Sequence, residues 1–247
     1  VSRAGGAEVH VADEPWDPDA PETSSIRFPT DLCTRKPSTD VIVAGSAVAP
    51  YREAVRELDV HVRVGPVQKH VRVFGPRVWY KAGIGKVSLT APEPFEAVPV
   101  RWEHAWGGAD YETDPERPLE EPRNPSGCGL AREVDALDGQ RGPQIEDPGE
   151  LIKSQRTRPR PAGLGAIGRH FAPRREYAGT CDALWMEERM PLLPLDFDPR
   201  FNQCAPPDQI TPAPLKGGER VGVAGMHEEG PFAFELPKLR FFVGLQT

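Results

Sequence analysis

The sequence lacks the features of a membrane protein, a disulfide-stabilised protein or a general nucleic-acid-binding protein. Its longest uncharged stretch, residues 41–51, is far shorter than the roughly 20 apolar residues of a membrane-spanning helix. Its 30 basic residues are outnumbered by 37 acidic ones, so the basic excess typical of a nucleic-acid-binding domain is missing. The four cysteines, Cys33, Cys128, Cys181 and Cys204, form no C-x-x-C pair. We interpret them as reduced, buried thiols of a cytosolic protein.

Recognisable catalytic motifs are also missing. Ser46 lies in Ala-Gly-Ser-Ala, which lacks the second glycine of a nucleophile elbow, and His227 has no second histidine at zinc-protease spacing. Residues 163–168 match the G-x-G-x-x-G pattern, but a dinucleotide site needs a strand before the glycines and a helix after them. Here arginines and prolines precede the glycines, and Pro173 is expected to break a following helix. We therefore predict no catalytic residues and no cofactor.

Proline and glycine are abundant instead, with 29 and 24 residues. This disfavours long helices and a broad parallel sheet, because proline interrupts both. Disorder along the whole chain is disfavoured as well, because 38% of the residues are hydrophobic and they fall in strand-like runs. We predict a mainly β fold: an antiparallel, β-sandwich-like scaffold with long Pro/Gly-rich loops and one short helix. The expected organisation is a single β-rich domain over residues 1–247, truncated at both ends, with a loop excursion over residues 110–180.

The clearest local pattern covers residues 58–74, where valines alternate with polar residues on both sides of Gly65-Pro66. This alternation predicts a β-hairpin, although Pro66 leaves its register open; if Val64 and Val67 flank the turn, His61 faces His70. A third strand of the same meander is expected at residues 77–80. Further strands are predicted over these shorter segments: 40–48, 98–102 as an edge strand, 220–224, 232–236 and 239–243. The predicted helix covers residues 181–190, with Thr180 as its N-cap.

The facing histidines raise the question of a metal site. A zinc site needs three or four ligands, and the sequence near His61 and His70 supplies no clear third one. We therefore predict no metal site and interpret both histidines as solvated side chains on the polar face of the hairpin.

Charge is distributed unevenly along the loops. Residues 153–175 carry seven basic side chains and no acidic one, whereas the preceding loops are rich in Asp and Glu. One interpretation is a dipolar surface that orients a protein partner. The alternative is that the two segments neutralise each other within the fold.

Several segments, taken together, resemble a bacterial family associated with type VI secretion, the domain-of-unknown-function family two-one-six-nine. Residues 36–47 resemble its K-P-x-T-D-V-x-V-x-G-x-A opening, and residues 101–108 its R-W-E-x-A-F-G-G motif, with Trp106 where Phe is usual. The best match is D-P-R-F-N-Q-C-A-P-P-D-Q at residues 198–209, where only Phe201 remains of two usual aromatics. Further similar segments are 62–65, 71–79, 124–129 and 161–165.

The resemblance implies an adaptor or chaperone that is not a catalyst. Such a protein binds a secreted effector in the cytoplasm and helps to load it onto the secretion spike, so its expected partners are the effector and the spike or tip protein. Neither nucleic acid nor membrane is an expected partner. We name six residues as candidates for partner binding, because aromatic anchors dominate interface energetics: Trp102, Trp106, Phe201, Asn202, Asp208 and Gln209.

Two other functions remain open at this stage. One is a hydrolase that uses Asp196, Asp198 or Asp208 with His104, which would require carboxylates and a histidine to converge in one pocket. The other is a structural component of the spike without chaperone activity. Tryptophans in such turns are also common core residues, and Asp208 and Gln209, after two prolines, are suited to fixing a turn.

Overall fold

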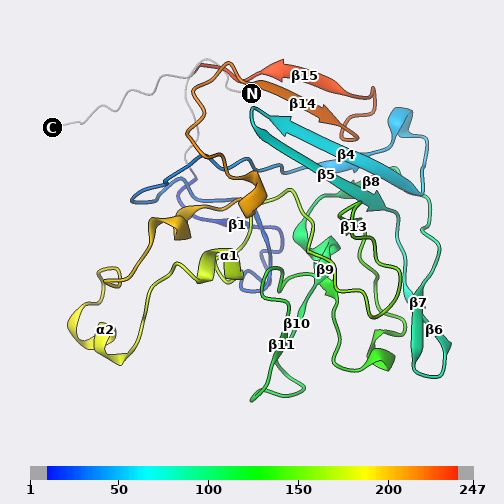
Figure 1. Cartoon of the computed structure of the whole chain (residues 1–247), viewed down its shortest axis with the longest axis horizontal. Helices are drawn as coiled ribbons and strands as arrows, with labels where there is room; N and C mark the ends of the chain where they lie inside the picture. The colour runs from blue at the N-terminus through cyan, green and yellow to red at the C-terminus, as the bar shows by residue number, and fades with distance from the viewer. Residues whose placement is uncertain (1–9, 239–247) are drawn as a thin grey trace.

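The computed structural model describes residues 10–238 and is built around one five-stranded antiparallel sheet (Figure 1). The strand order is β13-β5-β4-β14-β15. Its strands are β4 (Glu57–Val64), β5 (Val67–Phe74), β13 (Ile145–Glu146), β14 (Arg220–Ala224) and β15 (Phe232–Glu235). Figure 1 shows this sheet along one side of the molecule and the long loops on the other. The mainly β, antiparallel scaffold predicted from the sequence is confirmed.

The predicted central hairpin is confirmed, and the structure settles its register. Val64 pairs with Val67 at the turn, and His61 lies directly opposite His70. Gly65 has a φ of +54°, a conformation that glycine adopts without a steric penalty. The predicted strands at 220–224 and 232–236 are confirmed as β14 and β15, whereas the prediction at 239–243 lies outside the described residues.

The prediction that residues 77–80 form a third strand of the same meander is wrong: a strand begins at Trp79, but it belongs to another sheet. After β5 the chain leaves the sheet at Gly75-Pro76, and β6 (Trp79–Gly83) pairs with β7 (Lys86–Leu89) in a separate hairpin. The outer neighbour of β5 is β13, which follows about seventy residues later in the sequence. A proline cannot donate to a strand ladder, so Pro76 ends the alternation instead of continuing it.

Only part of the predicted strand at residues 40–48 forms. β3 (Ser46–Val48) pairs with β8 (Ala97–Pro99), in agreement with an edge strand near residue 98. The preceding residues 40–45 form hydrogen bonds with loops instead: Val41 N–H donates to the carbonyl of Gln209, and Val43 N–H to that of Leu164. Short pairs complete the strands: β1 (Glu14–Pro15) with β2 (Ile26–Phe28), β9 (Trp106–Gly107) with β12 (Cys128–Gly129), and β10 (Ala109–Asp110) with β11 (Leu119–Glu120).

The described residues contain two short α-helices instead of one. α1 (Ala172–Arg175) was not predicted; Pro173 lies in its first turn, where the missing N–H costs nothing, so this proline begins a helix instead of breaking one. α2 (Ala183–Glu188) is shorter than predicted, and its N-cap is Asp182, whose side chain accepts from Trp185 N–H. The 3₁₀ turns are η1 (Pro50–Arg52), η2 (Trp102–His104), η3 (Val134–Leu137), η4 (Pro199–Asn202) and η5 (Pro207–Gln209). No helix among residues 10–238 is long and apolar enough to cross a membrane.

The main core lies between the valine face of the sheet and the loops that cover it. The inward valines of β4 and β5 pack in one cluster with the β3–β8 pair and with loop residues, among them Leu164, Ile167 and Phe171. These three loop side chains are at most 1% exposed. Half of the core is therefore supplied by segments that have no regular secondary structure.

Trp102 joins those loops to one another. Its side chain is buried, and its Nε1–H donates to the carbonyl of Gly165 at 2.9 Å. The fully buried Asn124 donates from Nδ2 to the carbonyls of Trp102 and Trp106, each at 3.0 Å. Gly163 packs on the face of the indole, where a Cβ would lie 2.7 Å from ring carbons. We call Trp102, Asn124, Gly163 and Gly165 the Trp102 junction.

We expect Gly163→Ala to destabilise the protein by about 1–3 kcal/mol, because the added methyl group overpacks the indole of Trp102. The ring cannot move aside without losing its bond to Gly165 and its edge contact with Phe171. Gly222→Ala in β14 is the matched control, since a Cβ there meets no atom within 4 Å. Urea unfolding measures both variants; equal midpoints would contradict this role for Gly163.

Candidate functional site

The six candidate residues divide into a buried set and an accessible set. Trp102 and Trp106 are each 3% exposed and Gln209 is 1% exposed. The Gln209 Nε2–H group donates to the carbonyls of Val41 and Leu164, at 2.7 and 3.0 Å. These three side chains belong to the interior of the fold, although Trp102 also lines the proline-rich cleft described next. The more accessible candidates are Phe201, Asn202 and Asp208.

Asp208 lies beside a cleft of about 230 Å³ whose wall is rich in proline. The prolines lining it are Pro161, Pro173, Pro206 and Pro207. Asp208 forms an ion pair with Lys69 of β5, and across the cleft Arg160 pairs with Asp147 at 3.4 Å. Because these charges are paired with one another, the cleft offers a neutral and stiff surface.

The same ion pairs decide between the two interpretations of the charge pattern. Arg160 also pairs with Glu150 at 3.2 Å, and Arg175 with Glu120 at 3.1 Å. Arg174 is buried and donates to the carbonyls of Ile167 and Phe201, each at 3.0 Å. These arginines join loop to loop, which supports neutralisation within the fold over an outward-facing dipole.

A second accessible surface was not predicted from the sequence. Residues 180–198, which include α2, project from the body of the molecule (Figure 1, yellow). We call this segment the apolar excursion, because six of its large apolar side chains are between 47% and 85% exposed: Leu184, Met186, Met190, Leu192, Leu193 and Leu195. The sequence showed an apolar, proline-dense stretch here, but exposure cannot be read from composition.

The excursion is held in shape by polar bonds within itself. The indole Nε1–H of Trp185 donates to the carbonyl of Leu192 at 2.9 Å, and the guanidinium of Arg189 to that of Leu193 at 2.6 Å. At its base, Asp196 accepts from the backbone N–H and the hydroxyl of Thr180, at 2.9 and 2.8 Å. Its exposed apolar side chains are therefore presented on a pre-ordered backbone.

Phe201 and Asn202 lie where the excursion rejoins the body. Both line a shallow pocket of about 220 Å³, together with Leu193 and Phe197 of the excursion. The rings of Phe197 and Phe201 meet edge to face at 5.8 Å, and the Asn202 side chain donates to the carbonyl of Arg35 at 2.7 Å. The two candidate residues thus connect the apolar excursion to the rest of the fold.

The alternative catalytic arrangement does not assemble among the described residues. His104 is buried, and its Nδ1 lies 3.0 Å from the carbonyl oxygen of Pro99. The carboxylates proposed to act with it have other partners: Asp196 bonds to Thr180, Asp198 to Arg200 at 2.6 Å, and Asp208 to Lys69.

The cysteines are free, as predicted, but their burial differs from the prediction. Cys33 and Cys181 are exposed, Cys128 is half-buried and Cys204 is buried. Desolvation raises the pKa of the Cys128 thiol to about 11, so this group stays protonated at neutral pH and is a poor nucleophile.

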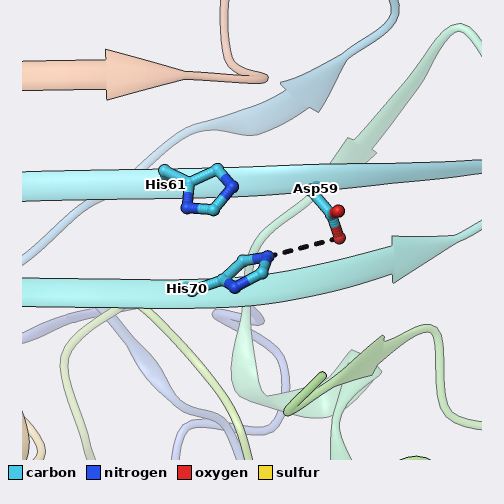
Figure 2. Close-up of side chains that lie close together, drawn as sticks. All are labelled: Asp59, His61 and His70. Atoms are coloured by element: carbon cyan, nitrogen blue, oxygen red, sulfur yellow. Dashed lines mark ion pairs between the residues drawn. The ribbon is translucent and has the colours of Figure 1, made fainter. Parts of the chain in front are cut away.

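A cluster of potential metal ligands lies on the solvent face of the main sheet (Figure 2). His61 and His70 stack with ring centroids 3.9 Å apart, and Asp59 Oδ1 lies 3.3 Å from His70 Nε2. The third residue that the sequence did not supply is therefore Asp59, two positions before His61. Its carboxylate also accepts two bonds from the guanidinium of Arg72, at 2.8 and 2.9 Å, which lowers the pKa of Asp59.

We expect the stability of the protein to fall as the pH drops from about 6.5 to about 4, in part because of His104. Burial, reinforced by the charges of Arg101 and Arg141, lowers the pKa of His104 to about 4 from its usual 6.5. In that pH range His104 binds a proton in the unfolded chain but stays neutral in the folded protein. The free energy of unfolding therefore falls by at most roughly 3 kcal/mol through this residue.

Urea unfolding between pH 7 and pH 4.5 measures this effect. His104→Gln should flatten the pH dependence of the unfolding free energy, whereas His227→Gln at an exposed position should leave it unchanged. An identical pH slope in the wild type and His104→Gln would show that His104 does not contribute.

The comparisons with known proteins agree with the resemblance at family level. A family model described as "Uncharacterized protein conserved in bacteria (DUF2169)" matches residues 4–247. No curated protein matches the chain, and no solved structure does.

Proposed function

This chain belongs to the bacterial family DUF2169, and from that premise we propose that it is a non-catalytic adaptor of type VI secretion. In this proposal it binds a secreted effector in the cytoplasm, covers an apolar part of it, and helps to load it onto the secretion spike. The resemblance of its motifs to secretion-associated proteins supplies the biological setting. The apolar excursion is the observation that carries the proposal.

Exposed apolar side chains gathered on one projecting segment are unusual for a protein that acts alone. Soluble monomers rarely expose large contiguous apolar patches, and those that do use them for binding. Six such side chains project from a backbone that is already ordered by Trp185, Arg189 and Asp196. Ordering before binding reduces the entropy lost on association, which favours a specific partner.

The accessible candidate residues fit the edges of such an interface. Phe201 and Asn202 lie at the base of the excursion, and Asp208 beside the proline-rich cleft. In the described part of the chain β15 is one of the two edge strands of the main sheet, and its Phe232 and Phe234 are 43% and 48% exposed. An extended effector segment added along this strand would be a further contact, because an open sheet edge offers unpaired backbone groups.

The test is a double substitution, Leu184→Asp with Leu195→Asp, in a strain that co-expresses a candidate effector. Both side chains are mostly exposed, so the fold should persist while the apolar contact is lost. Truncating a side chain central to an interface costs about 1–2 kcal/mol, so we expect the pair to weaken effector binding roughly 100-fold. Co-purification with the co-expressed effector, followed by a secretion assay, measures the loss.

Ile84→Asp is the matched control, because Ile84 is a fully exposed apolar side chain on the β6–β7 hairpin, outside the excursion. It should leave effector binding unchanged. If the effector stays soluble and is secreted after this gene is deleted, the adaptor proposal is wrong. Loss of secretion of every effector, with effector solubility unaffected, would indicate a structural spike component instead.

A catalytic role is tested separately with His104→Gln, because Asp208 is itself a candidate for partner binding. Under the adaptor proposal this variant secretes the effector at the wild-type level, provided that it remains folded. A variant that still binds the effector but fails to secrete it would favour the hydrolase alternative.

A further inference from the structure

The antiparallel register brings two histidines and a carboxylate onto one open face of the main sheet (Figure 2). His61 of β4 is directly opposite His70 of β5. Asp59 is two residues before His61, and residues two apart on a strand point to the same face. All three side chains therefore stand on the solvent side of the hairpin, opposite the valine core.

The distances between these side chains approach those of a tetrahedral metal site. A zinc ion holds its nitrogen and oxygen ligands at 2.0–2.2 Å, which places neighbouring ligand atoms about 3.3 Å apart. His70 Nε2 and Asp59 Oδ1 already have this separation, and one ligand atom from each of the three residues lies within 4.8 Å of the others. His61 is exposed, so a rotation of its side chain brings its nitrogen closer without moving the backbone.

A cavity of about 380 Å³ adjoins the two histidines. On the far side of His61, the nearest β14 residues on this face are Ala224, which pairs with His61, and Gly222; Pro231 and Phe232 also line the cavity. These small residues leave space over the imidazole of His61. A metal held by three side chains would thus keep an open position facing the cavity, where water or a further ligand can bind.

Some effects of the charged groups around the cluster favour metal binding and others oppose it. Arg72 fixes the Asp59 carboxylate through two hydrogen bonds and keeps it ionised, as partners of metal ligands often do. The same guanidinium repels a dication, and Arg63 and Lys69 also line the cavity. The balance favours a metal that binds imidazole strongly over one that depends on oxygen ligands.

We propose that Asp59, His61 and His70 bind a divalent transition metal of the zinc class, with a water molecule at the fourth position. Two imidazoles and one carboxylate are ligands that Zn²⁺ accepts readily, whereas Mg²⁺ and Ca²⁺ prefer all-oxygen sites. The sequence predicted no metal site because no clear third ligand was apparent; the register of the hairpin supplies it. This proposal does not rest on the proposed adaptor function.

The test is calorimetric titration of the untagged protein with Zn²⁺ alone. We expect one equivalent to bind, and His61→Ala or His70→Ala to weaken binding by at least about 100-fold, since even a residue that only supports a ligand is worth 10–100-fold. His10→Ala, in the separate β1–β2 region, is the control and should bind like the wild type.

Two further measurements separate a specific site from surface binding. Zn²⁺ should raise the melting temperature of the wild type but not of His61→Ala or His70→Ala, while all three melt alike without metal. X-ray absorption at the zinc edge should show two imidazoles and additional oxygen ligands. Failure of the wild type to bind Zn²⁺, or wild-type affinity in both histidine variants, would overturn the proposal.

Discussion

The buried indole of Trp102 is the contact on which the loop half of this protein depends. The indole N–H group donates to the carbonyl of Gly165, and Gly163 packs against the face of the ring. The backbone carbonyl of Trp102 accepts from the side chain of Asn124. A tryptophan buries a large apolar surface and, where its N–H group meets an acceptor as it does here, fixes the position of that carbonyl. Three loops from distant parts of the chain are thereby held at one point against the sheet.

This arrangement explains how a chain so rich in proline and glycine keeps a defined structure. Its long loops form few regular hydrogen-bond ladders, so their backbone groups bond to other loops and to buried side chains such as Gln209. Ion pairs such as Arg175 with Glu120 connect the loops at the surface. Proline lowers the entropy of the unfolded loop, which adds to the same effect. The glycines at 163 and 165 belong to this packing and not to a phosphate-binding loop.

The same architecture separates structural residues from those available for binding. The motifs that carry the family resemblance contribute all four residues of the Trp102 junction, and the same motifs include the buried Trp106 and Gln209. The accessible surface lies elsewhere, on the apolar excursion and on the solvent face of the main sheet. The aromatic residues of the recognisable motifs therefore belong mainly to the core of this fold, and most of its exposed large apolar side chains lie outside those motifs.

The sequence by itself determined the elements whose signal is local. Alternating valines specified the β4–β5 hairpin and placed its turn at Gly65-Pro66, because a strand has a period of two, whereas the structure fixed the register that pairs His61 with His70. Residues 220–224 and 232–236 were equally clear. The α2 helix was recognised, but its N-cap is Asp182, whose carboxylate accepts from Trp185 N–H, while the Thr180 hydroxyl donates to Asp196 instead of capping the helix.

Tertiary structure alone decided what depends on distant partners. It gave β13 to the sheet edge where residues 77–80 were expected, and it placed residues 40–45 against loops instead of in a strand. It buried two tryptophans, exposed Leu184 and Leu195, and brought Asp59 to the paired histidines. The burial of a side chain and the convergence of residues at a site depend on segments that are far apart in the sequence. A local sequence pattern specifies the conformation of one segment but not which other segments pack against it.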